Sequence, residues 1–64
     1  MTLGKRLKFL RRRNYYTQQQ LAQELNISAQ AISKWENDLS EPDLATLRKI
    51  AELYNMSISE LLEF

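Results

Sequence analysis

The 64-residue sequence contains no cysteine and no histidine, and it has only one glycine and one proline. Without cysteine the chain can form neither a disulfide nor a thiolate metal site. Without histidine it can supply neither a typical zinc site nor a Ser-His-Asp triad. We therefore expect no metal, no cofactor, no catalytic residues and no small-molecule ligand.

Long apolar runs are also missing. No stretch approaches the roughly 20 apolar residues that a membrane span needs, and nothing resembles a signal peptide. Hydrophobic residues nevertheless make up 44% of the chain, which suits a compact protein with one small core. We expect a single domain over residues 1–64, located in the cytoplasm and without a membrane partner.

The charges are unevenly divided, although the net charge is only +1. Residues 14–64 contain three basic and eight acidic residues, whereas residues 1–13 contain no acid and six basic residues: Lys5, Arg6, Lys8, Arg11, Arg12 and Arg13. A polyanion-binding surface produces such asymmetry, but a solvated basic helix does so as well. Charge alone leaves both interpretations open.

The spacing of apolar residues is helical throughout, and no alternating run suggests a strand. Capping residues and periodicity predict an all-α fold with helices at about 2–13, 18–25, 29–36, 44–54 and 58–62. Helix starts are marked by the N-cap residues Thr17, Ser28, Asp43 and Ser57, two of them with a capping box. Asn26 and Asn55 stand where helices would end in the left-handed conformation.

The connection between the second and third helices is only about three residues long, which predicts a helix-turn-helix over about 17–36. Ile32 and Trp35 mark the core face of the third helix. Its other side carries amide, hydroxyl, ammonium and methyl groups and no acid. These groups can read base edges, whereas a face meant only for solvent would usually carry Glu–Lys pairs.

Three side chains fall at unexpected positions. Arg11 and Glu36 both lie at core edges, where a half-buried charge needs a partner. Each is the best candidate for the other, and two independent surface charges are the alternative. Phe9 points away from the leucines of the first helix. It is either an exposed aromatic shielded by neighbouring basic side chains or a protein contact.

The last seven residues include four large apolar side chains. A short terminal helix can bury Ile58 and Leu61, which leaves Leu62 and Phe64 near the surface. These two either fold back onto the core edge or form a two-fold contact between copies. We favour a weak homodimer that is strengthened on DNA.

The segment TQQQLAQELNISAQAISKWEN resembles the helix-turn-helix of the Xre-type, lambda-repressor-like (Cro/cI-like) DNA-binding domains. LGKRLKFLRRR resembles the first helix of that family, and EPDLATLRKIAELYNMSISELL resembles its fourth and fifth. The resemblance implies a compact five-helix domain of a bacterial or phage regulator that acts on the nucleoid. It also implies dimers on near-palindromic double-stranded DNA operators.

The resemblance implies roles for individual residues. Arg11 and Glu36 match a structural ion pair of many members. Base reading is implied for Ala29, Gln30, Ser33 and Lys34, and phosphate contact for Gln18, Ser28 and Asn37. The chain departs from the family at Tyr15 and Asp38, where glycine is common. Tyrosine is unusual in the left-handed region, so we expect the turn after the first helix to differ from that of the family.

The sequence thus predicts sequence-specific binding of double-stranded DNA and regulation of transcription, with repression by promoter occlusion favoured. A protein-interaction module, such as an antitoxin, is the first alternative, because eight of the eleven charged residues in 14–64 are acidic and Phe9 is expected to be exposed. Salt-dependent DNA binding separates these two functions. The second alternative is an enzyme, but scattered acids without histidine, cysteine or a glycine-rich loop offer no site.

Overall fold

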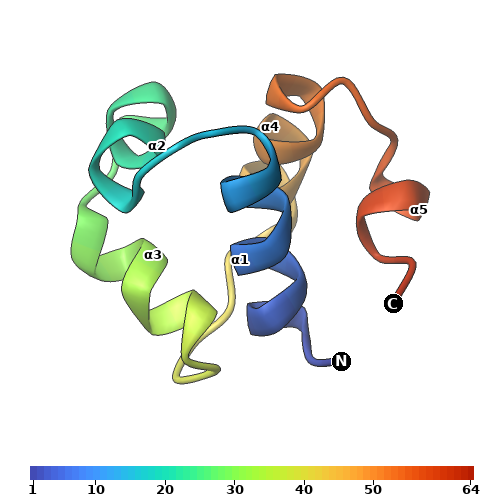
Figure 1. The fold of residues 1–64 in the computed structure, drawn as a ribbon, viewed down its shortest axis with the longest axis horizontal. Helices are drawn as coiled ribbons and strands as arrows, with labels where there is room; N and C mark the ends of the chain where they lie inside the picture. Colours follow the sequence, from blue (N-terminus) through green and yellow to red (C-terminus); the bar gives the residue numbers. More distant parts are fainter.

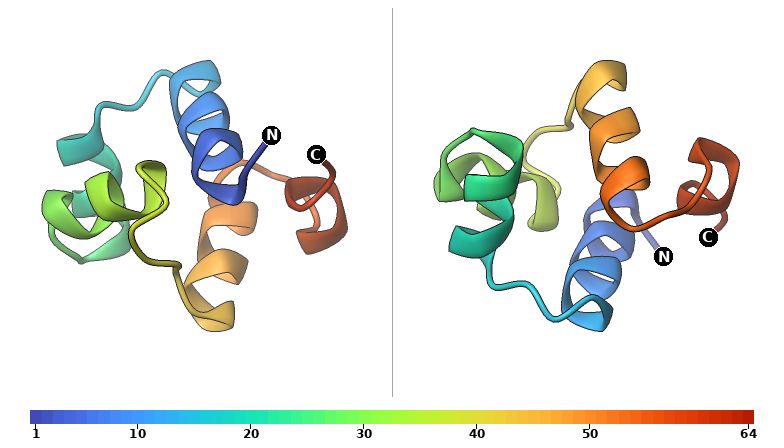
Figure 2. Two further views of the ribbon diagram at one scale, coloured as in Figure 1. Left: turned by 90° about the horizontal axis from the view of Figure 1, so that it is seen from below. Right: turned by 90° about the horizontal axis from the view of Figure 1, so that it is seen from above.

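The computed structural model describes residues 1–64 as five α-helices without a strand (Figure 1). The helices are α1 (Leu3–Arg13), α2 (Gln18–Leu25), α3 (Ala29–Glu36), α4 (Leu44–Leu53) and α5 (Ile58–Leu61). α1 and α4 lie at the centre, with α2 and α3 on one side and α5 on the other (Figure 2). The predicted all-α, five-helix fold is confirmed. No helix is long and apolar enough to cross a membrane.

Helix starts follow the capping residues that the sequence indicates. Each N-cap side chain accepts a hydrogen bond from the backbone N–H three residues later, and both predicted capping boxes are present. The hydrogen bonds from Thr46 hold the pKa of the Asp43 carboxyl below its usual range. Three predicted helices are one residue too long, because Thr2, Tyr54 and Leu62 act as caps.

Four non-glycine residues adopt the left-handed conformation. Asn26 and Asn55 do so as predicted, with φ of 56° and 55°, and Asp38 joins them at 57°. Tyr15, after α1, also lies in this region with φ of 64°, although tyrosine is unusual there. The Tyr15 side chain is exposed and meets no obstacle, and two backbone hydrogen bonds to the end of α1 close the turn.

All five helices contribute side chains to the core. Ten buried apolar side chains form one cluster, in which α3 and α5 each contribute a single member. These residues are Leu7, Leu10, Leu21, Ala22, Leu25, Ile32, Leu47, Ile50, Ala51 and Leu61. Because α3 buries only Ile32 and Glu36, the side of the helix that carries Gln30 and Lys34 remains available for other contacts.

The short helix α5 is tied to α1 by Arg6. The Arg6 guanidinium donates from Nε to the carbonyl of Leu61 at 2.9 Å and from Nη2 to the carbonyl of Glu60 at 2.8 Å. These carbonyls belong to the last turn of α5, where a helix leaves carbonyls without a partner from a following turn, although the Glu60 carbonyl also accepts the N–H of Glu63. Arg6 therefore has a structural role that its position in a basic run did not indicate.

Gly4 lets α1 approach the end of α3 closely. A Cβ atom at this position would overlap the carbonyl oxygen of Trp35 and the carboxylate of Asp38. The Gly4 N–H donates to Asp38 Oδ1 at 2.9 Å, and the Thr2 hydroxyl donates to Oδ2 at 2.7 Å. Asp38 thus caps α1 from the turn that follows α3, a contact between residues 34 positions apart.

Replacement of Gly4 by alanine should reverse the usual order of helix propensity. Alanine normally stabilises a helix by about 1 kcal/mol over glycine. Here we expect Gly4→Ala to lower the free energy of unfolding by about 1–3 kcal/mol, because the methyl group must displace packed backbone. Urea unfolding measures the change, and Ala45→Gly on the exposed side of α4 calibrates ordinary propensity. A Gly4→Ala protein more stable than the parent would contradict the close approach.

Candidate nucleic-acid interface

Helices α2 and α3 form the helix-turn-helix that the sequence predicts. The left-handed residue Asn26 ends α2, and Ser28 caps α3 two residues later. Burial of Leu25 and Ile32 in the common core holds the two helices at a sharp angle (Figure 1). The short turn and the shared core therefore present α3 to solvent as a rigid element.

The outer side of α3 gathers the residues for which sequence analysis expected base contacts. Gln30 and Lys34 are exposed, and Ser33 is half-buried. Ala29 is also half-buried and packs partly against the core, so its methyl group is less accessible than the other three side chains. None of these four side chains is acidic. Because every one is short, hydrogen-bonding or cationic, the surface suits a negatively charged, hydrogen-bonding ligand.

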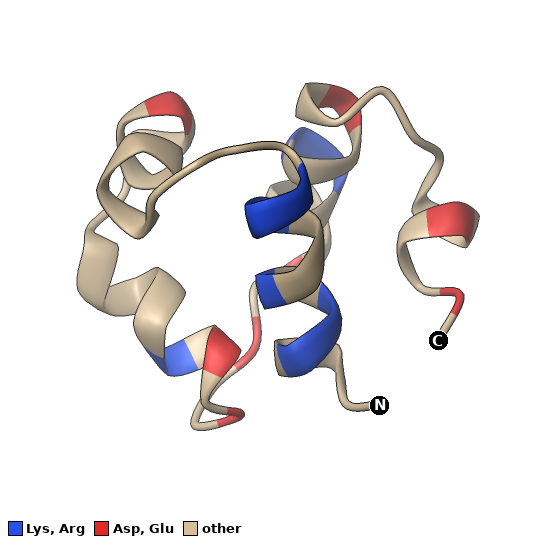
Figure 3. Cartoon of the chain, viewed as in Figure 1, with Lys and Arg blue, Asp and Glu red and all other residues tan.

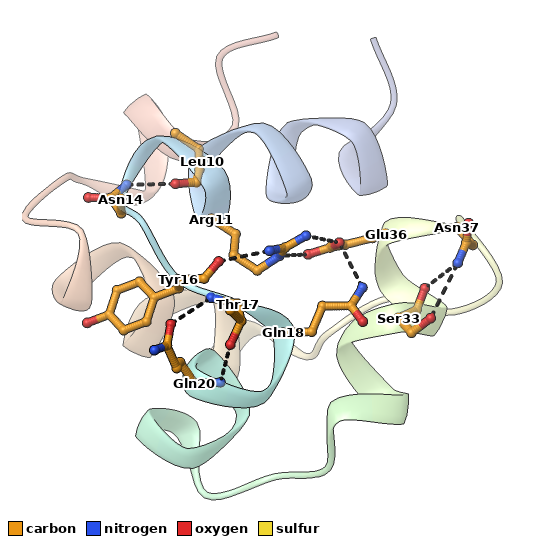
Figure 4. Close-up of polar contacts among 10 residues, drawn as sticks. All are labelled: Leu10, Arg11, Asn14, Tyr16, Thr17, Gln18, Gln20, Ser33, Glu36 and Asn37. Atoms are coloured by element: carbon orange, nitrogen blue, oxygen red, sulfur yellow. Dashed lines mark hydrogen bonds and ion pairs between the residues drawn. The ribbon is translucent and has the colours of Figure 1, made fainter.

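The only acid of α3 is turned inward. Glu36 is 7% exposed, and the Arg11 guanidinium of α1 bonds both of its carboxylate oxygens (Figure 4). The distances are 2.7 Å from Nε to Oε2 and 3.0 Å from Nη2 to Oε1. The ion pair expected between these two residues is therefore present. It neutralises the charge that would otherwise oppose an anion at α3.

Two further groups complete what we call the Arg11–Glu36 cluster, which consists of Arg11, Tyr16, Gln18 and Glu36. Arg11 Nη1 donates to the carbonyl of Tyr16 at 2.8 Å, and Gln18 Nε2 donates to Glu36 Oε1 at 3.1 Å (Figure 4). The cluster joins α1, the start of α2 and the end of α3. The Gln18 bond is not predictable from the sequence, because no local pattern relates residues 18 positions apart.

The three residues expected at phosphates are all engaged within the protein. Gln18 uses one amide hydrogen on Glu36. The Ser28 hydroxyl oxygen accepts from the Ala31 N–H at 3.2 Å, which leaves its hydrogen free to donate. The Asn37 amide donates to the Ser33 carbonyl at 2.8 Å and lies 3.5 Å from its hydroxyl. Gln18 and Ser28 thus each keep one hydrogen that they can donate to a phosphate, whereas the Asn37 side chain must rotate before it can donate one.

Basic residues concentrate on α1, next to the helix-turn-helix (Figure 3). Lys34 is the only cation of the motif itself. Lys8 stands one helical turn after Gly4 and one turn before Arg11, the two residues of α1 that bond the end of α3. Among the free cations of α1, Lys8 is therefore on the flank nearest to α3.

Removing either partner of the central ion pair should strand a buried charge. We expect Arg11→Met or Glu36→Gln to lower the free energy of unfolding by roughly 3–5 kcal/mol. The double variant should lose less than the sum of the two, since neither charge is then left alone. Thermal or urea unfolding measures the cycle, with the exposed neighbour Arg12→Met as the control. Additive losses would show that the two side chains do not stabilise each other.

Comparisons with known proteins agree with this geometry. Residues 7–61 match the family described as Helix-turn-helix. The chain is 47% identical over 62 residues to the HTH-type transcriptional regulator ImmR of Bacillus subtilis (strain 168), across 97% of this chain and 49% of ImmR. It spans 30–56% of the length of the curated relatives that it matches.

Two solved structures share the fold. One is the biofilm master regulator SinR in complex with DNA, with a TM-score of 0.85 and 25% identity over 97% of this chain and 100% of that chain. The other is the P22 c2 repressor in complex with synthetic operator 9T, with a TM-score of 0.86 and 27% identity. That match covers 98% of this chain and 96% of the repressor chain. The chain therefore belongs to the helix-turn-helix family, as an Xre-type, lambda-repressor-like domain, and this is a family of DNA-binding transcription regulators and not of enzymes.

Proposed function

We propose that this chain binds a specific sequence of double-stranded DNA and thereby regulates transcription, in the first place as a repressor. One observation carries the proposal: α3 exposes amide, hydroxyl and ammonium groups, while its single acid is buried against Arg11. An acid on that surface would repel phosphates, and the Arg11–Glu36 cluster removes it. The similarity to SinR and the P22 c2 repressor, both solved with DNA, supports the same function.

In this proposal α3 enters the major groove, whose width admits an α-helix. The N-terminus of α2 then sits on the phosphate backbone, where free N–H groups and the helix dipole favour a negative charge. Gln18 is the first residue of α2, and Ser28 caps α3. Together with Asn37, these side chains would position the domain on phosphates without reading sequence.

Base readout falls to the outer face of α3. A glutamine amide at Gln30 can bond adenine N6 and N7, and an ammonium at Lys34 can bond guanine O6 and N7. The Ser33 hydroxyl can serve either kind of base, and the Ala29 methyl can pack on the thymine methyl. Lys8, on the flank of α1 nearest α3, would add the salt-dependent and sequence-independent part of the affinity.

Repression is the proposed outcome, because a domain bound at a promoter excludes other proteins from the same DNA. The P22 c2 repressor, which shares the fold, supports this choice. In this proposal the domain acts on the nucleoid, in the cytoplasm of a bacterial or phage-infected cell. Selection of bound sequences from random duplex DNA tests the proposal and reports the site and any half-site spacing. Failure to enrich any sequence would contradict it.

Gln30 offers the most direct test of readout. We expect Gln30→Ala to weaken binding to the selected site by about 1–3 kcal/mol and to relax the preference at one or two base pairs. Quantitative binding to selected and random duplexes measures both effects. Gln23→Ala, on the exposed side of α2, is the matched control and should leave both affinities unchanged. An equal loss on both duplexes would instead place Gln30 at a phosphate.

We also propose a weak homodimer that is strengthened on a near-palindromic operator. Leu62 and Phe64 are 43% and 52% exposed, directly after the buried Leu61 of α5. In a two-fold contact each copy would bury these side chains of the other. A dimer would place two α3 helices one DNA turn apart, roughly 34 Å, and so favour symmetric half-sites.

Sedimentation over a concentration series, with and without the selected operator, tests this contact. Leu62→Ser should raise the dimer dissociation constant by about tenfold or more, since burial of a leucine contributes about 1.5–3 kcal/mol. Leu39→Ser removes an apolar side chain that is exposed in the turn after α3 and should leave the constant unchanged. A chain that stays monomeric on a single asymmetric half-site would refute the dimer. Loss of the dimer only in Leu39→Ser would move the contact to that turn.

A further inference from the structure

The outward side of α1 carries four cations and one phenylalanine without an acid among them. These residues line an open hollow of about 570 Å³. We call this surface the α1 basic face, and it consists of Lys5, Lys8, Phe9, Arg12 and Arg13. All five residues are exposed. Lys8 is also proposed to contribute to DNA affinity, but neither the fold nor the proposed DNA contacts account for the other four residues.

The cations of this face have no acidic partner in the chain. Of the six basic residues in α1, Arg11 pairs with Glu36 and Arg6 bonds the carbonyls of α5. The pair between Arg11 and Glu36 is the only ion pair of the structure. Like charges three and four residues apart destabilise a helix. The α1 basic face therefore contains unfavourable pairs of like charges, which an acidic partner would relieve.

Phe9 is the unusual member of this face, because a surface meant only for phosphates gains little from a phenyl ring. It is 44% exposed, and the Arg13 guanidinium lies 5.8 Å from the centre of its ring. The guanidinium lies over the ring, so the exposed part of the ring is an apolar surface that borders a cation. Such a surface complements a second aromatic ring or a large apolar side chain next to a carboxylate.

The position of Phe9 on α1 separates it from the proposed DNA interface. Gly4 and Arg11 mark the side of α1 that faces α3. At 3.6 residues per turn, Phe9 points about 140–160° away from that side, and Arg13 about 160–180°. DNA held on the outer side of α3 would leave both side chains free. Apart from Lys8, which flanks α3, the α1 basic face can therefore be occupied while α3 is bound.

We propose that the α1 basic face docks an acidic segment of a partner protein with an aromatic or large apolar side chain between its carboxylates. The apolar side chain packs on Phe9 in the hollow. The carboxylates meet Lys5, Arg12 and Arg13, where arginine can bond them in a bidentate manner. Charge complementarity selects the acidic class, and the exposed ring selects a protein segment over a bare polyanion. This interaction does not depend on the proposed DNA binding.

A short acidic peptide, acetyl-EEFEEL-amide, is a suitable probe for titration into the ¹⁵N-labelled chain. We expect amide shifts along the outward side of α1 and saturable binding. Phe9→Ser and the pair Arg12→Gln with Arg13→Gln should each weaken binding about tenfold or more, as expected for loss of an aromatic contact or of charge-assisted hydrogen bonds. Arg48→Gln with Lys49→Gln removes two exposed cations from α4 and should leave binding unchanged.

Thermal unfolding verifies that each variant is folded, which the exposure of the substituted side chains favours. Four results would overturn the proposal. The first is that the peptide does not bind the parent chain, and the second is that the α4 control loses as much affinity as the α1 variants. The third is that a peptide with serine in place of phenylalanine binds equally well. The fourth is that short random duplex DNA displaces the peptide and shifts the same amides. The last result would identify the face as a nucleic-acid surface.

Discussion

The bidentate ion pair between Arg11 and Glu36 is the interaction on which the arrangement of this domain depends. It joins α1 to α3 through two hydrogen bonds and draws in the backbone of Tyr16 and the amide of Gln18. A buried pair of charges need not add net stability, but it fixes geometry because neither charge tolerates the loss of the other. Here it also takes the only acid of α3 away from the surface.

A second constraint acts at the other end of the contact between α1 and α3. The missing side chain of Gly4 lets the helices approach, and Asp38 uses both carboxylate oxygens to cap α1. The left-handed conformation of Asp38 aims its side chain at this helix start. The family commonly has glycine at this position. Aspartate is compatible with the fold here, because its two hydrogen bonds to the start of α1 offset the cost of the left-handed conformation.

The basic run of α1 divides into three groups once the fold is known. Arg6 and Arg11 are structural, and each satisfies groups that would otherwise be buried or free at a helix end. Lys8 flanks the helix-turn-helix. The remaining cations surround Phe9 on the side that points away from α3. Adjacent charges in the sequence therefore belong to different surfaces, since each residue of a helix is rotated by about 100° from the last.

The sequence by itself determined the five helices, their caps, the helix-turn-helix and the family, because capping and apolar periodicity act over three or four residues. It also identified the partners Arg11 and Glu36, since both flank predicted core faces. Only the tertiary structure decided the hydrogen bonds of Gln18, Arg6 and Asp38, and the left-handed turn at Tyr15. These contacts join residues 18 to 55 positions apart, or depend on a turn closed by its surroundings. No local pattern encodes such contacts, because packing of the whole core brings their atoms together.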